Sequence, residues 1–359
     1  MSRIDPLLVA VMVTIVAVGL VMVTSASVAI AERQSGGPTF YLLRQLAYCG
    51  AALVVVALVL RVPSTIWQRL GPLLLLFSLF LLLILFIPGL GRTVNGSTRW
   101  LMLGSINFQA SELTKLAVVI YLAGYLVRRQ REVRRHMKYF LRPMFLITFI
   151  GLIILVEPDF GAMVVILSTA MGMMFIGGVR LLHFLSLALL AMGGALLLAI
   201  SNPYRMSRIS GFLDPWQDPF NSGFQLTQAL IAFGRGEWFG VGLGNSVQKL
   251  FYLPEAHTDF VYAVMAEELG MVGAVVLILL FVVLIQRIFR IGRQAEIRGE
   301  LFSAYSCYGI AIWLAVQAFV NMGVNMGLLP TKGLTLPLVS YGGSSMVISC
   351  MALAIVLRI

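Results

Sequence analysis

Continuous apolar runs, separated by short polar segments, follow one another along the whole chain. The run from Pro72 to Ile87 reads PLLLLFSLFLLLILFI, without the alternation of apolar and polar residues that marks a membrane-spanning strand. A helix needs about 20 mostly apolar residues to cross a hydrocarbon core of ~30 Å. The pattern therefore predicts an all-α, polytopic membrane protein with about ten transmembrane helices. We expect these helices at Pro6–Ala29, Leu42–Leu60, Pro72–Ile87, Ser111–Val127, Pro143–Val156, Phe160–Gly178, Leu182–Ile200, Phe260–Ile285, Leu301–Val320 and Ser340–Leu357.

The composition agrees with this interpretation. Hydrophobic residues make up 60% of the 359 residues, charged residues make up 11%, and the mean hydropathy is +0.95. These values exclude an ordinary soluble protein. The first apolar run is longer than the core of a secretory signal peptide and follows Asp5, so we expect it to be retained as the first helix. The whole chain, 1–359, is predicted to form a single membrane domain.

Basic residues are concentrated in two connecting segments. RRQREVRRHMKYFLR (128–142) lies between the fourth and fifth runs, and RIFRIGRQAEIRGE (287–300) lies between the eighth and ninth. Because positively charged loops stay in the cytoplasm, these segments and both chain termini are predicted to be cytoplasmic. This topology accounts for the net charge of +11, and no nucleic-acid partner is needed to explain it.

The opposite, extracytoplasmic side then carries a long loop, Ser201–Thr258, between helices seven and eight, and the shorter segments Arg92–Gly104 and Asn321–Val339. A loop of this length with balanced charges is more often functional than a passive connection. Its stretch SGFQLTQALIAFG has helical spacing and is expected to lie along the membrane surface. The glycines of GVGLGNS (Gly240–Ser246) follow no strand, so we interpret them as turns and not as a nucleotide-binding loop.

Two carboxylates lie inside the eighth apolar run, where lipid would be expected. They are Glu267 and Glu268, in the stretch LPEAHTDFVYAVMAEELG. A charge at the centre of a membrane costs about 2.5–3.5 kcal/mol on insertion scales, so such residues normally face a cavity or a partner. For Glu268 we predict a buried partner that fixes helix packing.

Asp259 stands at the outer start of the same run. Either Thr258 or Asp259 could simply cap the helix. The alternative is a functional polar cluster at the membrane surface, because Glu255 and His257 lie immediately before Asp259 and beside the long loop. The pattern alone leaves both interpretations open.

Lys115 lies one turn into the fourth run and follows Glu112 by three residues. It could reach the interface or pair with Glu112, or it could line a functional cavity; the spacing does not separate these readings. The three cysteines fall within apolar runs and the three histidines are scattered. The sequence therefore predicts neither a disulfide framework nor a histidine-rich metal site.

Several long motifs of the sequence match those of a known protein family. They are FLDPWQDPFNSGFQLTQALIAFGRGEWFGVGLGNSVQKL, YLPEAHTDFVYAVMAEELG and MGLLPTKGLTLPLVSYGGSS, with STRWLMLG and ASELTKLAVVIYLAGYLVRR upstream. Together they resemble the SEDS family (shape, elongation, division and sporulation), and within it the FtsW branch. The resemblance covers essentially the whole chain. It implies a ten-helix fold and a peptidoglycan glycosyltransferase that polymerises lipid II on the outer face of the bacterial cytoplasmic (inner) membrane, at the division septum.

The same resemblance implies partners and functional residues. The partners would be a class B penicillin-binding protein, which is an FtsI-like transpeptidase, and division proteins like FtsQ, FtsL and FtsB. The essential aspartate of the family falls on Asp259. Other positions linked to activity in the family match Arg99, Trp100, Lys115, Arg128 and Lys332. The chain departs from enterobacterial relatives at Phe251, where glutamate is common, and at Asn107, where arginine is common, which weakens any role for these two side chains.

Glycan polymerisation joins a sugar hydroxyl to the anomeric carbon of a lipid-diphosphate donor. The hydroxyl is a weak nucleophile, so a carboxylate that accepts its proton is expected. We assign this role to Asp259, whose proton affinity a neighbouring Glu255 would raise. Cations must stabilise the departing diphosphate, and the candidates are Lys332, Arg99 and Lys115, with Mg²⁺ or Mn²⁺ as a further candidate. Trp100, His257 and Glu255 complete the expected substrate-binding set, and a single carboxylate predicts direct displacement with inversion.

Two functions of other classes remain open from the sequence. A polytopic bundle with charged cavity residues could be a transporter that flips lipid II, although no inverted repeat with paired broken helices is evident. The chain could also be a scaffold that recruits division proteins. In that case Asp259 would be dispensable and the outer loops would not.

Overall fold

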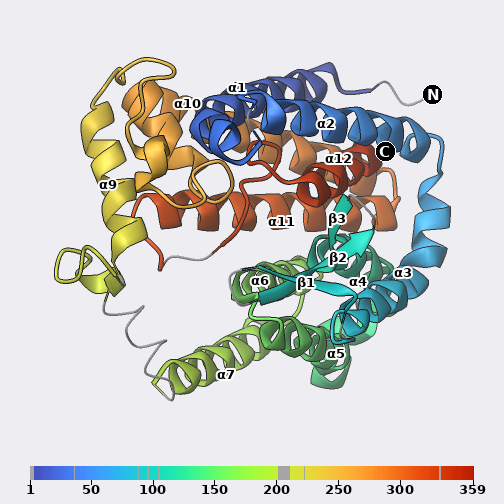
Figure 1. Ribbon diagram of the computed structural model, residues 1–359. Helices are drawn as coiled ribbons and strands as arrows, with labels where there is room; N and C mark the ends of the chain where they lie inside the picture. The colour runs from blue at the N-terminus through green and yellow to red at the C-terminus, as the bar shows by residue number, and fades with distance from the viewer. Residues whose placement is uncertain are drawn as a thin grey trace.

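The computed structural model describes residues 4–35, 37–87, 89–94, 97–103, 106–200, 211–221, 223–330 and 333–359. Most of this chain is helical (Figure 1). The helices are α1 (Pro6–Ser35), α2 (Phe40–Val59), α3 (Ser64–Ile84), α4 (Ala110–Arg135), α5 (Met137–Val156), α6 (Phe160–Ile176), α7 (Leu181–Ile200), α9 (Phe224–Gly236), α10 (Val261–Ile297), α11 (Leu301–Asn325) and α12 (Gly343–Arg358), with a π-helical turn, η1, at Gln248–Tyr252.

In the described part of the chain, seven helices are long and apolar enough to cross a membrane: α1, α2, α3, α4, α5, α10 and α11. The helix α4 is buried along most of its length and forms the centre of the bundle. By contrast, α2, α3 and α5 expose large apolar side chains such as Leu53, Leu73 and Phe145, which is the surface expected to face lipid. The prediction of a helical protein with several membrane spans is confirmed.

Two helices begin well before the starts that the sequence predicted. Both predicted starts are prolines, but Pro72 lies inside α3, which begins at Ser64, and Pro143 lies inside α5, which begins at Met137. Membrane helices tolerate such prolines because neighbouring groups satisfy the freed backbone atoms. At the other end of the bundle, α10 continues to Ile297, well beyond the predicted end at Ile285.

A small sheet is the clearest departure from an all-α fold. The segment 92–104 was predicted to be a loop, but it contributes to three antiparallel strands, β1 (Gly91–Val94), β2 (Ser97–Leu103) and β3 (Ile106–Gln109), in the order β1-β2-β3. Strands this short carry little periodic signal. The sheet packs beside α4, with β3 leading directly into that helix (Figure 1).

Contacts between distant segments gather the basic connections at one end of the bundle. Asp5 accepts a hydrogen bond from Arg287, and Arg298 donates to the carbonyl of Ile359 over 3.2 Å. The Arg134 guanidinium donates to the carbonyl of Gly177 over 3.3 Å. Residues 287–300 therefore contact both the start of α1 and the end of α12. The other Arg-rich segment, 128–142, contacts the end of α6. Figure 1 likewise draws the start of α1 and the end of α12 on one side of the molecule.

The helix α10 is interrupted at Gly270, whose φ of 70° and ψ of −170° are not helical. The interruption is completed by residues 237–242 of the long loop. Before the break, the main-chain carbonyls of Glu267 and Glu268 accept from the amides of Val241 and Gly242, each over 3.0 Å. After the break, the amides of the next two residues, 271 and 272, donate to the loop carbonyls of residues 237 and 238 over 2.8 and 3.1 Å. Because lipid offers no hydrogen bonds, these loop contacts satisfy the backbone of a broken membrane helix.

The two carboxylates of α10 hold the same loop through their side chains. Glu268 accepts from the Lys249 ammonium over 2.8 Å and from the Ser25 hydroxyl over 2.7 Å. Glu267 accepts from Arg235 over 3.0 Å, from the Ser246 hydroxyl and from two loop amides. Both carboxylates are fully buried. The predicted buried partner for Glu268 is confirmed, and it is Lys249.

Removing Lys249 tests this anchoring. In Lys249→Met the buried Glu268 loses its cation, and we expect unfolding to become easier by about 3 kcal/mol. The matched variant is Arg235→Met. Arg235 is 43% exposed and Glu267 keeps its other donors, so the expected loss is about 1 kcal/mol or less. Chemical unfolding in detergent measures both, and equal losses would contradict the assignment.

Candidate active site

The backbone of Asp259 is fixed from α11. Side-chain amides of Asn321 and Asn325 donate to the Asp259 carbonyl over 2.9 and 3.0 Å. The side-chain oxygen Oδ1 of Asn325 also accepts from the main-chain amide of Ala263 over 3.0 Å, which satisfies a donor in the first turn of α10. The N-cap position of α10 is Phe260, without a side-chain cap. The capping interpretation of Asp259 is therefore wrong, because Asn325 satisfies this turn and the Asp259 carboxylate is available for another role.

The Asp259 carboxylate and the Arg99 guanidinium approach the same glycine. A Cβ atom added to Gly333 would lie 2.9 Å from Oδ2 of Asp259 and 3.9 Å from Nη1 of Arg99. Glycine at this position therefore leaves space beside both groups. Lys332 directly precedes Gly333 in the sequence, but it lies outside the described residues.

The surroundings raise the proton affinity of Asp259. Its side chain is partly buried, and its pKa rises to about 7, first because of burial and then because of the negative charges of Glu255 and Asp159, while Arg99 opposes the rise. A carboxylate with a pKa near neutrality is better suited to accept a proton at physiological pH than one with an ordinary pKa.

Two acids that the sequence analysis missed lie between α5 and α6. Asp159 caps α6 by accepting from the amide of Ala162 over 3.2 Å, and it also accepts from Ser111 over 3.1 Å. Glu157 is 4% exposed. Burial and the charge of Asp159 raise its pKa to about 8, against the opposing effect of Arg99. The sequence signal was EPDFG, which places two carboxylates between apolar runs on the predicted outer side.

The sheet brings Arg99 and Gln109 to the segment of these acids. Arg99, on β2, donates to the carbonyl of Pro158. Trp100 is paired with Gln109 across β2 and β3, and the Gln109 side chain donates to Asp159 over 3.2 Å. The main-chain amide of Gln109 donates to the Ser344 hydroxyl over 3.0 Å. The start of α12 therefore fixes β3, an edge strand of the sheet.

His257 lies in an aromatic cluster. Its ring centroid is 4.7 Å from that of Tyr41 and 5.6 Å from that of Tyr341. Burial lowers the pKa of His257, and the nearby Glu255 opposes that effect. Glu255 is exposed and accepts from the Thr258 hydroxyl over 2.8 Å. Both residues therefore lie in the turn that leads to Asp259, as the sequence predicted.

Lys115 is placed in the interior and is fully partnered. Its ammonium lies 2.9 Å from Glu112, donates to Gln317 over 2.7 Å and lies 5.5 Å from the Trp313 ring centroid. Gln317 donates to the carbonyl of Thr335 over 3.0 Å. Lys115 thus supports the segment that carries Gly333. Arg128 lies 13 residues further along α4, which is about 20 Å towards the other end of the helix.

A preformed cation site is not found among the residues that the structure describes, because no three or more Asp, Glu, His or Cys side chains gather suitably. Mg²⁺ commonly binds through one or two carboxylates together with substrate phosphates. The described residues therefore do not make up a complete Mg²⁺ or Mn²⁺ site by themselves.

The described site is thus built from four segments that are distant in the sequence: β2, the connection 157–159, the turn 255–259 and the segment that begins at Gly333. It combines a carboxylate of near-neutral pKa with a guanidinium. This pair can accept a proton from a hydroxyl and can stabilise negative charge on a leaving group.

Comparisons with known proteins identify similar chains. A family model described as "Cell cycle protein", for FtsW, RodA and SpoVE, matches residues 5–359. Probable peptidoglycan glycosyltransferases FtsW are 59% identical in Nitrosococcus halophilus, covering 97% of this chain and 89% of that protein, and 52% identical in Legionella pneumophila, covering 95% and 87%.

Solved structures agree in fold. A chain from a peptidoglycan synthase complex, described as coordinating polymerization and crosslinking, has a TM-score of 0.81 and 31% identity, covering 100% of this chain and 98% of that one. The rod shape determining protein RodA of Thermus thermophilus has a TM-score of 0.73 and 30% identity, covering 99% and 96%.

Proposed function

As a member of the FtsW, RodA and SpoVE family of cell cycle proteins, the chain is a peptidoglycan glycosyltransferase, and we propose that it polymerises lipid II with Asp259 as general base. The observation that carries this assignment is the state of the Asp259 carboxylate. This carboxylate does not cap α10, because Asn325 does so. Its pKa is about 7, and it lies beside Arg99.

In the proposed reaction, the 4-hydroxyl of the acceptor N-acetylglucosamine attacks the anomeric carbon of the donor. Asp259 accepts the hydroxyl proton as the new C–O bond forms. The bond between the anomeric carbon and the diphosphate breaks, and undecaprenyl diphosphate leaves. Arg99, with Lys332 next to Gly333, would stabilise the charge on that diphosphate. A single displacement of this kind inverts the anomeric centre, so an α-linked donor gives a β-linked glycan.

The other candidate residues take supporting roles in this proposal. Trp100 follows Arg99 on β2, and in this proposal its ring packs against a sugar of the substrate. His257 and Glu255 shape the turn of Asp259, and Lys115 holds the segment of Gly333 through Gln317. Lys115 would then be a positioning residue and would not itself contact the diphosphate.

The proposed topology has ten crossings with both termini in the cytoplasm. The seven long apolar helices would be joined by α6, α7 and α12, which are also apolar. The Arg-rich connections support this orientation through the positive-inside rule. Asp259 would then lie at the outer face, where the long loop between α7 and α10 covers the interrupted part of α10.

The proposed partners are lipid II as substrate, a class B penicillin-binding protein of the FtsI type, and division proteins like FtsQ, FtsL and FtsB, with action at the septum of the inner membrane. The relation to a peptidoglycan synthase complex supports a crosslinking partner. Polymerisation next to a transpeptidase would deliver new glycan directly to the enzyme that crosslinks it.

The pH dependence of polymerisation gives one test. The ionised form of Asp259 is the base, and its pKa of about 7 means that acidification below pH 7 removes the reactive form. We expect kcat/KM to fall about tenfold per pH unit below pH 6.5 and to level off above pH 7.5. A profile that stays flat down to pH 5 would contradict Asp259 as the base.

The decisive experiment uses the purified protein in liposomes with fluorescent lipid II, with and without its crosslinking partner. Formation of glycan polymer supports the proposal. Movement of lipid II across the bilayer without polymer would favour the flippase, and neither activity in either sample would favour a scaffold. Polymer length on a gel and accessibility of the fluorophore to an external quencher separate these results.

A further inference from the structure

The helix α11 has three amide side chains at a spacing of four residues: Gln317, Asn321 and Asn325. Because residues four apart lie on the same face of a helix, the three amides form one polar stripe. All three are buried. A polar group buried in a membrane bundle is costly unless it is paired, so it marks either helix packing or a functional site. The partners of each amide decide between these roles.

Asn321 joins two segments that are not helical. Its side-chain amide donates to the main-chain carbonyl of Asp259 over 2.9 Å and also to the main-chain carbonyl of Leu334. Because carbonyl oxygens only accept, the NH2 group of Asn321 must face both of them, and both of its hydrogens are used. Asn321 therefore bridges the turn 255–259 and the segment 333–336.

This bridge sets a spacing within the candidate active site. Gly333 directly precedes Leu334, and a Cβ atom added to Gly333 would lie 2.9 Å from Oδ2 of Asp259. The main chain at Gly333 therefore lies close to the carboxylate. A small shift of this segment would either fill the space beside Oδ2 or widen it. Lys332, which precedes Gly333 in the sequence, would move with the same segment.

The two other amides of the stripe do not make this bridge. Asn325 donates to the same Asp259 carbonyl over 3.0 Å, but its second hydrogen goes to the carbonyl of Asn321 within α11. Gln317 donates to the carbonyl of Thr335 over 3.0 Å, on the other side of the site. In the described part of the chain, Asn321 is therefore the one amide of the three that contacts both segments.

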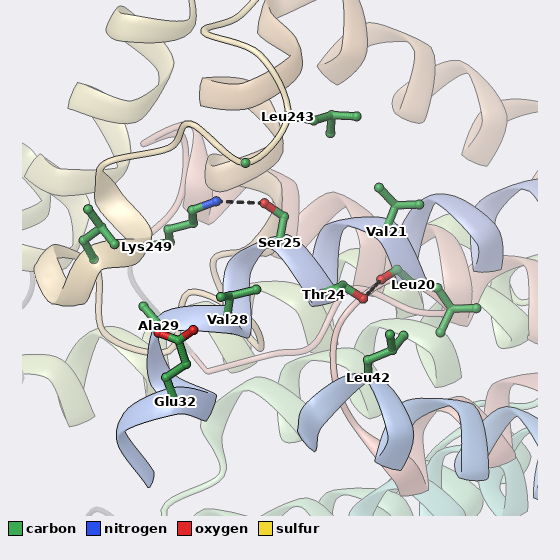
Figure 2. Close-up of a pocket in the computed structure, with 12 residues that line it drawn as sticks. Leu20, Val21, Thr24, Ser25, Val28, Ala29, Glu32, Leu42, Leu243 and Lys249 are labelled. Atoms are coloured by element: carbon green, nitrogen blue, oxygen red, sulfur yellow. Dashed lines mark hydrogen bonds between the residues drawn. The ribbon is translucent and has the colours of Figure 1, made fainter. Parts of the chain in front are cut away.

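Helix packing alone does not account for Asn321. Elsewhere in the bundle, a buried polar group such as Lys249 fastens the long loop to a helix, since it donates to the Ser25 hydroxyl of α1 over 3.0 Å (Figure 2). Asn321 differs, because both of its hydrogens go to connecting segments. Its Oδ1 atom is buried and accepts from no group that the structure describes. An apolar side chain would pack α11 without leaving that oxygen unpaired.

From these contacts we infer that Asn321 is a positioning residue for glycosyl transfer, which fixes Asp259 relative to the segment of Gly333 and Lys332. The inference rests on the proposed function, because it adds a support for the base of that reaction. Asn321 acts through Asp259 and not on the substrate. It keeps the group that accepts the proton at a fixed distance from the segment that would stabilise the diphosphate. Such a spacing governs kcat more than substrate affinity.

Hydrogen–deuterium exchange of the purified protein in nanodiscs tests the bridge without any substrate. In Asn321→Ala, main-chain amides of both 255–260 and 334–337 should exchange about tenfold faster than in wild type, because both segments lose a hydrogen bond. In the matched variant Asn325→Ala, only the turn that leads into α10 should exchange faster. Unchanged exchange in Asn321→Ala, or faster exchange in one segment alone, would overturn the bridge.

Polymerisation of fluorescent lipid II tests the positioning role. We expect Asn321→Ala to lower kcat about thirtyfold and to leave KM within about twofold. Asn321→Ser keeps one donor, which can serve one carbonyl at a time, so it should lower kcat in the same way while leaving fewer buried groups unpaired. Gln130→Ala is the control, because Gln130 of α4 donates to the Tyr305 hydroxyl near the start of α11 over 3.0 Å. Its kcat should stay within about twofold of wild type.

The outcomes separate positioning from folding. A lower thermal midpoint is expected of both Asn321→Ala and Gln130→Ala, but only the first should lose kcat. An Asn321→Ala protein whose kcat falls less than about threefold would overturn the positioning role. So would failure of both Asn321 variants to give monodisperse protein when Asn325→Ala does, since Asn321 would then serve folding. If wild type forms no polymer, the proposed function fails, and the exchange measurement still decides whether the bridge exists.

Discussion

Asp259→Asn is expected to lower the rate of lipid II polymerisation by at least about a hundredfold, because general base catalysis contributes about 10²–10⁴. Asparagine has nearly the same shape but cannot accept the proton. The fold should survive, since Asn321 and Asn325 bind the main-chain carbonyl of residue 259 and not its side chain. The measurement is polymer formed per minute by purified protein of verified monodispersity.

Glu255→Gln is the matched control for Asp259→Asn. Glu255 is exposed and acts on Asp259 through its charge, so this variant should keep the rate at pH 8 within about threefold. Its activity should persist to lower pH than that of wild type, because removing the negative charge lowers the pKa of Asp259. An Asp259→Asn protein that keeps more than a tenth of the wild-type rate would contradict the base assignment.

Gly270→Ala is expected to prevent formation of a stable protein. The φ of 70° and ψ of −170° at this position belong to a region that is essentially restricted to glycine. A Cβ atom would also lie 2.4 Å from the amide nitrogen of Gly240 and 2.5 Å from the carbonyl oxygen of Trp238. The Trp238 carbonyl accepts from the amide of Val272, and the Gly240 amide donates to Gly236. Neither atom can move without losing a hydrogen bond, so we expect a loss of more than about 4 kcal/mol.

Gly234→Ala provides the comparison, since Gly234 lies in α9, close to the same region, and a Cβ atom there would meet nothing within 4 Å. It should fold normally, or slightly better, because alanine favours a helix. Yield of monodisperse protein and the thermal midpoint in detergent measure both variants. If the thermal midpoint of Gly270→Ala lies within about 2 °C of that of wild type, the backbone at position 270 accommodates a side chain, contrary to this prediction.

The central parts of the helices could be predicted because length and continuous hydrophobicity determine them. Their ends could not, since Pro72 and Pro143 are accommodated inside helices. The sheet was missed because strands of four to seven residues carry too few positions for a periodic signal. The turns predicted at the glycine-rich segment are present, with positive φ at Gly240, Gly242 and Gly244.

In the candidate site, the neighbouring residues of Asp259 predicted a polar cluster and the direction of the effect of Glu255, whereas the role proposed for Asp259 came from the resemblance to the family. Burial, the largest cause of the raised pKa, was not predictable. The role of Glu157 and Asp159 depends on the approach of Arg99 from β2, and the freedom of the Asp259 side chain depends on Asn325 from α11. Such contacts join positions some 60 residues apart, and only the folded chain brings them together.

The interruption of α10 has a consequence for biosynthesis. Residues 237–242 precede α10 in the chain and supply the hydrogen bonds that its broken backbone lacks. Under the proposed topology, this loop reaches the far side of the membrane before α10 leaves the ribosome. The part of α10 around Gly270 would therefore reach its final structure only when residues 237–242 pack against it. Tagging within 237–242 should then leave α10 inserted but incompletely folded, which limited proteolysis of the purified protein would detect.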